Sequence, residues 1–310
     1  MISVVSLNPA LDKIYFVDSF EVGCMTRTNK IIKSAGGKGI NVARVLAKMK
    51  ADVFVTGFLA GSTGEWLQRN VKELDIENDF IWVDGETRSN INIIDTVNET
   101  ETELLESGPV ISEAHIRSFL EIFNRTLETT KVLVCTGGLP EGIPANFYKT
   151  LIELSKPHGI KTILDASGEA LKEGIKAEPD YIKPNLRELS QLVGKDHNST
   201  QDVIESCNKI IGLGVGSVIA SLGSEGAVFV DRNIKMFIKP SQINVVNAIG
   251  SGDSMTAGIA YGLEKDYSIA EMVKLGTACA MSNTQFREIG TINPEMVSRF
   301  VKEVKIDYLD

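Results

Sequence analysis

Short apolar runs alternate with longer stretches of helical periodicity along nearly the whole chain, and this alternation limits the folds open to it. Buried strands are expected from the apolar runs at 2–7, 53–58, 131–135, 162–164 and 217–221. Helices are expected from the apolar spacing over 40–49, 112–129, 144–157, 199–212, 251–264 and 268–286. Such alternation favours a mostly parallel sheet that helices cover on both faces. We therefore expect an α/β protein with a three-layer α/β/α core, formed by residues 1–310 as one domain.

Two stretches break this rhythm and predict a second, smaller sheet. The segments 14–18 and 29–33 are strand-like, and the segments 90–97 and 101–105 predict a β-hairpin around a turn at 98–100. No helical pattern separates the members of either pair, so they cannot form β-α-β units. We expect them to make an inserted lid from about 10–34 and 88–107. The final residues, 306–310, are expected to be a loose tail.

The charge of the chain limits its partners. It has 32 Lys and Arg against 41 Asp and Glu, which gives 32 − 41 = −9 at pH 7. A net negative surface repels phosphate backbones and anionic membranes, so we expect neither a nucleic acid nor a membrane as partner. An anionic ligand would need a local cluster of basic side chains. Four scattered cysteines and the lack of an apolar run of about 18 residues indicate a reduced, cytoplasmic protein.

A glycine-rich segment at 35–41 opens the helix expected at 40–49. Its glycines, Gly37 among them, let backbone N–H groups approach a ligand, and the N-terminus of a helix favours an anion. Lys38 adds a positive charge, and Asn41 can bond a hydroxyl group. The segment lacks the spacing of a Walker A loop. The alternative is a glycine turn where a helix packs tightly on a strand.

A second glycine segment opens the helix expected at 251–264. Gly250, Ser251 and Gly252 leave successive N–H groups at the helix N-terminus, which could stabilise charge on a transferring phosphoryl group. Asp253 follows in the first turn, where its carboxylate could accept the proton of an attacking alcohol. The alternative is that Asp253 only caps the helix.

Two further segments indicate phosphate or nucleotide binding. Asn185 and Glu188 are three residues apart, so they share a helix face and could organise Mg²⁺ beside phosphates. The alternative is an ordinary capping box. The glycine loop at 221–226 follows a buried strand, a common nucleotide-binding geometry. The alternative there is a tight turn into a strand at 227–230.

Three charged residues, Asp12, Arg27 and Arg88, fall in or beside the inserted strands. Arg88 could hold a substrate phosphate through two parallel hydrogen bonds, and Asp12 could accept bonds from sugar hydroxyls. Each of the three could instead be a solvated surface charge.

Taken together, these segments resemble the motifs of the ribokinase-like sugar kinases, the phosphofructokinase B family. The stretch 36–41 is similar to the first signature of that family, and 247–260 is similar to the second. Residues 183–188 resemble its Asn-x-x-Glu magnesium motif. The opening at 7–12 is similar to that of its bacterial hexose-phosphate branch. The motifs match in order and spacing from residue 2 to about 300.

The resemblance implies a role for each candidate residue, with ATP as phosphoryl donor and Mg²⁺ as cofactor. It implies Asp253 as catalytic base and an anion hole at Gly250, Ser251 and Gly252. It implies that the sugar phosphate is held by Asp12, Arg27, Gly37, Lys38, Asn41 and Arg88. It implies an ATP site formed by Lys183, Asn185, Ser221, Gly223, Ser224, Gly226 and Asn283. Asn185 and Glu188 would support Mg²⁺ through water, and two lids would clasp into a homodimer.

The resemblance leaves the substrate open between two ketohexose monophosphates. One activity phosphorylates the 1-hydroxyl of tagatose 6-phosphate, and segments 87–90 and 102–109 favour it. The other phosphorylates the 6-hydroxyl of fructose 1-phosphate, and the opening at 8–12 favours that one. We place the first ahead. A sensor that kept the fold but lost catalysis is the non-enzymatic alternative, although a sensor has no need of Asp253.

Two departures from the family pattern are visible. Ser251 stands where Ala is more usual, which should be harmless because the backbone N–H does the binding. Gly138 stands where Ser is common, so a side-chain contact to the substrate could be missing.

Overall fold

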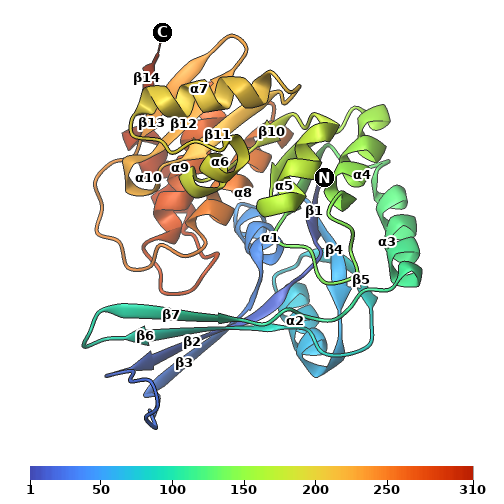
Figure 1. Cartoon of the computed structure of the whole chain (residues 1–310), viewed down its shortest axis with the longest axis vertical. Helices are drawn as coiled ribbons and strands as arrows, with labels where there is room; N and C mark the ends of the chain where they lie inside the picture. The colour runs from blue at the N-terminus through green and yellow to red at the C-terminus, as the bar shows by residue number, and fades with distance from the viewer. Residues whose placement is uncertain (310) are drawn as a thin grey trace.

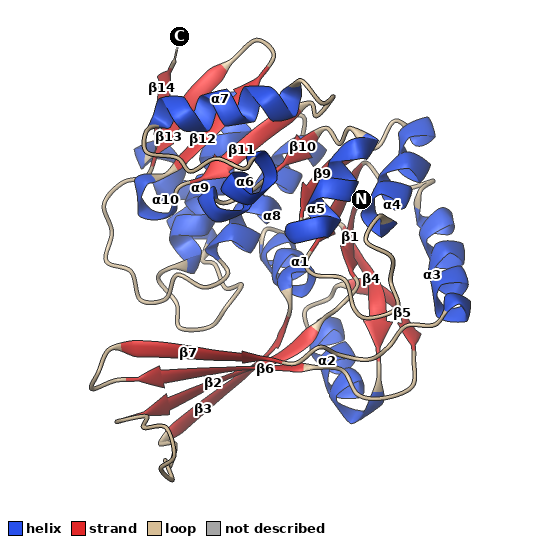
Figure 2. Ribbon diagram, in the orientation of Figure 1, coloured by secondary structure: helices blue, strands red, loops and turns tan. Residues whose placement is uncertain are grey.

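A ten-stranded sheet forms the centre of the molecule, and a separate four-stranded sheet extends from it (Figures 1 and 2). The computed structural model describes residues 1–309. The order of the large sheet is β14-β13-β12-β11-β10-β9-β8-β1-β4-β5. Neighbouring strands from β11 to β5 are parallel, and those from β11 to β14 are antiparallel. The expected α/β/α core with a mostly parallel sheet is confirmed.

The strands of the large sheet are β1 (Ile2–Ser6), β4 (Val53–Leu59), β5 (Glu77–Trp82), β8 (Val132–Thr136), β9 (Lys161–Asp165), β10 (Tyr181–Ile182), β11 (Ser217–Ser221), β12 (Ala227–Asp231), β13 (Lys235–Lys239) and β14 (Lys305–Tyr308). The helices are α1 (Lys38–Lys48), α2 (Gly61–Glu73), α3 (Glu113–Thr126), α4 (Phe147–Ser155), α5 (Gly168–Gly174), α6 (Leu186–Val193), α7 (Thr200–Ile211), α8 (Ser251–Glu264), α9 (Ile269–Asn283) and α10 (Pro294–Glu303).

Alternate residues of the central strands enter two different cores, one on each face of the sheet. Val4 belongs to a buried cluster with apolar residues of α1, α2, α8, α9 and α10. Its neighbour Val5 belongs to another with residues of α3, α4, α5 and α7. Both valines are fully buried. Because successive side chains of a strand point to opposite faces, this pattern produces the three layers.

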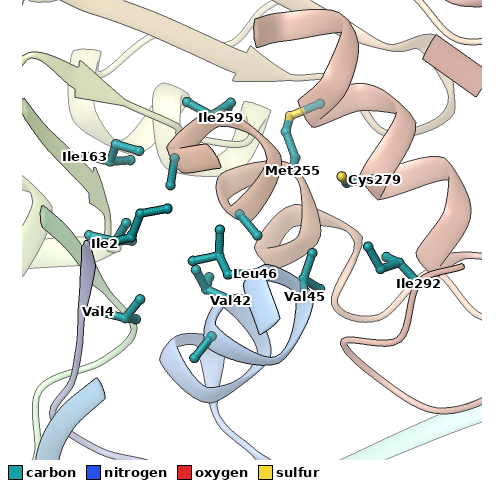
Figure 3. Packing of buried hydrophobic residues seen from close by; sticks show 14 of the residues in the cluster. Ile2, Val4, Val42, Val45, Leu46, Ile163, Met255, Ile259, Cys279 and Ile292 are labelled. Atoms are coloured by element: carbon teal, nitrogen blue, oxygen red, sulfur yellow. The ribbon is translucent and has the colours of Figure 1, made fainter. Parts of the chain in front are cut away.

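Helix α8 lies in the middle of its layer, between α1 and α9. Figure 3 shows Ile2 of β1 near Leu46 of α1, with Ile259 of α8 above them. On its other side α8 meets α9 backbone to backbone. A Cβ placed on Gly258 would lie 2.7 Å from the Cα of Gly276, so the two backbones are in direct contact here. Any rotation of one helix, or any separation of the two, would open this contact.

The second sheet has the order β3-β2-β6-β7 and supplies the lid (Figure 2). Its strands are β2 (Ala10–Val17), β3 (Lys30–Gly36), β6 (Ser89–Asp95) and β7 (Thr100–Leu105). The predicted hairpin is present as β6 and β7, which pair antiparallel. The turn between them is held by Asp95, whose carboxylate accepts bonds from the N–H groups of Val97 and Asn98.

One expectation about the C-terminus is wrong. Residues 305–308 form β14, which pairs antiparallel with β13 at the edge of the large sheet. The segment has no strong apolar alternation, so its pairing depends on the exposed edge of β13 more than on its own sequence. Asp310 lies outside the described residues. Within residues 1–309, no helix combines the length and apolar character that crossing a bilayer requires.

Candidate active site

A cavity of about 500 Å³ lies where the lid sheet meets the N-termini of α1, α6 and α8. Most of the residues that the sequence singled out line this one cavity, although they come from elements far apart in the chain. They are Asp12, Gly37, Lys38, Asn41, Arg88, Lys183, Asn185, Glu188, Ser221, Gly223, Gly250, Ser251, Gly252 and Asp253.

The start of α8 presents free amides to this cavity. Gly250 caps the helix in the left-handed conformation (φ 78°), which a residue with a side chain rarely adopts. The first helical hydrogen bond runs from the N–H of Ser254 to the carbonyl of Gly250, at 2.9 Å. The N–H of Ser251 instead bonds the carbonyl of Ala248 at 3.2 Å. Of the predicted anion hole, Ser251 is thus already bonded, and Gly252 can supply its N–H together with Asp253, the next residue of the first turn.

Asp253 is a buried carboxylate at the end of the cavity. Its Oδ2 accepts a hydrogen bond of 2.9 Å from Nδ2 of Asn41 on α1, and the residue is 7% exposed. Burial raises the pKa of Asp253 to about 6, and the negative charge of Asp165 adds to this, while Lys38, Asn41 and Lys183 oppose it. A carboxylate with a raised pKa is a better proton acceptor than an ordinary aspartate, and it remains ionised at neutral pH.

This pKa has a consequence that a titration can check. Because the folded value lies above the ordinary value of 3.8, Asp253 should take up its proton as the pH falls through about 6. Carbon-13 NMR of aspartate-labelled protein should show one carboxyl resonance that titrates near pH 6 and is absent from the Asp253→Asn variant. Titration of that resonance near pH 4 would contradict the raised pKa.

Two lysines share a buried counter-ion beside Asp253. Asp165, at the carboxyl end of β9, lies 3.6 Å from Nζ of Lys38 and 3.4 Å from Nζ of Lys183. Its side chain is 0% exposed and also accepts a bond of 2.8 Å from the hydroxyl of Thr256 on α8. Burial alone would raise the pKa of Asp165, but Lys183 and Lys38 outweigh this and hold it below the ordinary value. In turn, the negative charge of Asp165 raises the pKa of Lys38.

Sequence analysis did not identify Asp165, and it predicted no protein partner for Lys38. Lys38 was expected to hold the sugar phosphate, as Arg88 was. The structure places its Nζ at the Asp253 end, between Asp165 and Glu188, the latter at 3.9 Å. The signal for Asp165 was its place directly after the apolar run 162–164, since ligands of parallel sheets bind at the carboxyl ends of strands.

The segment at the start of α6 forms the capping box that was the alternative interpretation, and it also lines the cavity. Asn185 caps the helix, accepting from the N–H of Glu188 at 2.8 Å, and Oε2 of Glu188 accepts from the N–H of Asn185 at 2.9 Å. Oε1 of Glu188 remains directed toward Lys38, and both capping residues line the cavity. Within residues 1–309 no group of three or more His, Cys, Asp or Glu could hold a metal by itself. One carboxylate oxygen with waters and phosphate oxygens fits Mg²⁺, which seldom takes an all-protein cage.

Arg88 lies at the lid end of the cavity. Nε of Arg88 donates to the carbonyl of Asn8 at 3.1 Å, and Nη1 donates to Oδ1 of Asn90 at 3.1 Å. Nδ2 of Asn90 donates in turn to Oδ1 of Asp12 at 2.8 Å. Burial raises the pKa of Asp12, against the opposing effects of Asn90, Arg44 and Arg88. Asn90 belongs to the segment 87–90 that favoured tagatose 6-phosphate, but the sequence assigned no contact to its side chain.

A second, more apolar cavity of about 880 Å³ adjoins the first. Gly223, Ala248 and Ser251 line both. Ser224 and Gly226, which were predicted to bind the nucleotide, line the second cavity. Its other walls come mainly from α8, α9 and the loop before α8: Pro240, Ser241, Gln242, Ile243, Asn244, Val245, Met255, Thr277, Ala280, Met281 and Thr284.

Two of the predicted site residues line neither cavity. Arg27 is exposed in the loop between β2 and β3, in a small surface hollow with Cys24 and Met25. Asn283 is 1% exposed, and its Nδ2 donates to the carbonyl of Ile249 at 2.8 Å. It therefore supports the loop before α8 through this bond, without lining either cavity. A Cβ on Gly138 would meet nothing within 4 Å, so the backbone there would have room for a serine.

These features define a class of protein. A buried carboxylate, two free amides at a helix N-terminus and a pair of lysines occupy one end of a cavity, and an arginine occupies the other. Such groups are what transfer of a phosphoryl group to an alcohol requires.

Comparison with known proteins identifies the family. Residues 1–296 match the model of the pfkB family carbohydrate kinases. The chain is 36% identical to a tagatose-6-phosphate kinase of Staphylococcus epidermidis over 310 residues, which covers 99% of each chain. The chain belongs to the pfkB family of carbohydrate kinases, and it is an ATP-dependent phosphotransferase.

Two solved structures extend the comparison. Phosphofructokinase-2 of Escherichia coli, in complex with fructose-6-phosphate, is 26% identical with a TM-score of 0.89 and covers 97% of this chain and 98% of its own. A Thermotoga maritima protein described as a possible 1-phosphofructokinase is 27% identical with a TM-score of 0.91 and covers 100% of both.

Proposed function

We propose that this protein transfers the γ-phosphoryl group of ATP to a terminal hydroxyl of a ketohexose monophosphate and releases the 1,6-bisphosphate. The leading substrate is tagatose 6-phosphate, as in the Staphylococcus epidermidis relative. The observation that carries the proposal is the separation of charges in one cavity: the base and two lysines at one end, and Arg88 at the other. A six-carbon sugar with one phosphorylated end suits that arrangement.

The reacting end is formed by residues of this chain with distinct tasks. Asp253 accepts the proton of the attacking hydroxyl, and the hydrogen bond from Asn41 orients its carboxylate. The N–H groups of Gly252 and Asp253 bind the phosphoryl oxygens on which charge builds up. Lys38 and Lys183 balance the same charge, and Asp165 holds both ammonium groups in place.

The donor nucleotide would extend from there into the apolar cavity beside α9. The free oxygen of Glu188 would hold Mg²⁺ through water, and the metal would neutralise charge on the phosphates. Lid and core together would exclude water from the γ-phosphoryl group, which limits hydrolysis. We propose that the lid and the core are parts of a single kinase domain and that the enzyme acts in the cytoplasm.

The substrate can be decided by a coupled assay of ADP release. Tagatose 6-phosphate, fructose 1-phosphate, fructose 6-phosphate, ribose and adenosine would be ranked by kcat/KM. We expect tagatose 6-phosphate to rank first, because the full-length relative at 36% identity carries that activity. Fructose 1-phosphate in first place would favour the 1-phosphofructokinase alternative. Ribose or adenosine in first place would overturn the proposal, and binding without ADP release would indicate a sensor.

We further propose that two chains pair through their lids. Tyr15 is in register with Ile31 on one side and Ile93 on the other, so these side chains share one face of the lid sheet. Ile31 of β3 is 45% exposed, and Leu104 of β7, the strand at the other edge of this sheet, is 56% exposed. Such a face on a four-stranded sheet is stabilised when another apolar surface covers it.

Light scattering at micromolar concentration should therefore report a dimer. Leu104→Asp should shift the protein toward the monomer, because burying a charge in an apolar interface is unfavourable. Leu213→Asp changes a leucine of similar exposure, 61%, on the core and should leave the dimer intact. A wild-type chain that is monomeric at this concentration would contradict lid pairing.

A further inference from the structure

Two opposite charges lie close together in the lid without forming an ion pair. Arg88 and Asp12 each contribute to the electrostatic environment of the other, and burial disfavours the charged form of both. Asp12 is 6% exposed. Among residues 1–309, Arg88 forms no ion pair with any carboxylate, although opposite charges in a partly desolvated site attract strongly.

The amide of Asn90 lies between them and bonds to both. Its Oδ1 accepts from Nη1 of Arg88 at 3.1 Å, and its Nδ2 donates to Oδ1 of Asp12 at 2.8 Å. A guanidinium group can only donate and a carboxylate can only accept, so the orientation of this amide is determined by its two partners. An amide is the side-chain group that can satisfy both sides without adding charge.

The backbone register places the three residues for this contact. Asn90 stands directly opposite Asp12 in the parallel pair β2–β6. Arg88 precedes Asn90 by two residues, so their side chains lie on the same face. The carbonyls of Asn8 and Glu106 accept from Nε and Nη1 of Arg88 at 3.1 and 3.4 Å. Within residues 1–309, Nη2 has no hydrogen bond of its own, so that edge of the guanidinium can face an anion.

We propose that Asn90 is a positioning residue that acts as a neutral spacer between Arg88 and Asp12. It keeps the guanidinium available to the phosphate of the sugar and the carboxylate available to a sugar hydroxyl. Without it, Arg88 would pair with Asp12, and each would neutralise the group that the substrate needs. This inference rests on the proposed function, because it assigns the phosphorylated end of the substrate to Arg88.

A double-mutant cycle tests the coupling. Asn90→Ala should raise KM for tagatose 6-phosphate about tenfold, with KM for ATP unchanged and kcat within about threefold of wild type. Arg88→Ala should raise the same KM by about ten- to a hundredfold. The double variant should match Arg88→Ala alone, because Asn90 acts through Arg88. Effects that multiply in the double variant would overturn the proposal.

Two further variants extend this double-mutant test. Asn90→Asp keeps the size of the side chain but sets a second carboxylate against Asp12 and gives Arg88 a charged partner, so it should raise the KM as Asn90→Ala does. Asn29→Ala removes a bond of the same kind, from Asn29 to Asp18 at 3.0 Å, at an exposed place on the lid. It should leave the KM unchanged. If Asn90→Asp kept the wild-type KM for tagatose 6-phosphate, this result would also contradict the spacer role of Asn90.

A crystal structure of Asn90→Ala without substrate separates this inference from the proposed function. We expect a nitrogen of Arg88 within 4 Å of a carboxylate oxygen of Asp12. A guanidinium that stays in its wild-type position would refute the spacer role. If the wild-type enzyme accepted no ketohexose phosphate, the proposed function would fail, and this structure would still decide whether Asn90 separates the two charges.

Discussion

Replacing Asp253 by asparagine should lower kcat by about 10²–10⁴-fold, the usual contribution of a positioned general base. The amide keeps the shape of the side chain and can remain beside Asn41, but it cannot take a proton from the attacking hydroxyl. The measurement is ADP release at saturating concentrations of both substrates. The Kd for ATP, measured by calorimetry, should stay close to wild type, because the change removes an interaction that matters only in the transition state.

The control for this variant is Asp266→Asn. Asp266 is a surface acid that pairs with Lys131 at 2.7 Å, remote from the cavity, and its loss should leave kcat unchanged. If Asp253→Asn retained more than a third of the wild-type kcat, Asp253 would not be the base. Its raised pKa would then reflect only burial and the nearby charge of Asp165.

Replacing Lys38 by methionine should lower kcat by about 10²–10³-fold, the effect typical of losing one preorganised donor to a developing charge. Lys38 faces Asp165 and Glu188 at the Asp253 end of the cavity, so we expect it to act on the transferring phosphoryl group. KM for the sugar phosphate should change little. Steady-state kinetics with each substrate varied in turn would give both constants.

The change also leaves Asp165 with Lys183 as its only nearby ammonium group among the described residues. A thermal melt should therefore accompany the kinetics, to show that the variant is folded. Lys161→Met removes a surface pair with Asp180 at 3.0 Å and should keep full activity. A large rise in KM for the sugar phosphate at constant kcat would instead restore the sequence-based expectation that Lys38 binds the substrate phosphate.

The layers of the fold were predictable because buried parallel strands are nearly continuous apolar runs. Five such runs correspond to β1, β4, β8, β9 and β11. Strand β14 was not predictable, because it forms on the edge of β13 and its own residues, 305–308, are mostly exposed. Short helices such as α5 were missed for a similar reason, since a helix of seven residues shows too little periodicity.

Within the site, the positions of the residues on their helices were easier to predict than the directions in which their side chains extend. The glycine segments placed Lys38 and Asp253 at helix starts, where the structure has them. The sequence could not show which way the long side chain of Lys38 extends, because that depends on Asp165, 127 residues further along the chain. The contact of Asp12 with Asn90 likewise depends on strand register across 78 residues. Asn185 and Glu188 show that a capping box and a cavity-lining pair can be the same residues.

The contact between Gly258 and Gly276 bears on how this enzyme could be re-engineered. Because α8 meets α9 there without side chains between them, even a methyl group at Gly258 would displace the helix that carries Asp253. The lid, in contrast, reaches the acceptor through side chains on the strands of a small sheet that stands apart from the core (Figure 1). Directed evolution toward a different acceptor should therefore accumulate its changes in β2, β6 and β7 and leave α8 untouched. The residues that can vary with the substrate therefore lie in the lid, and the residues that the phosphoryl transfer requires lie on α8 in the core.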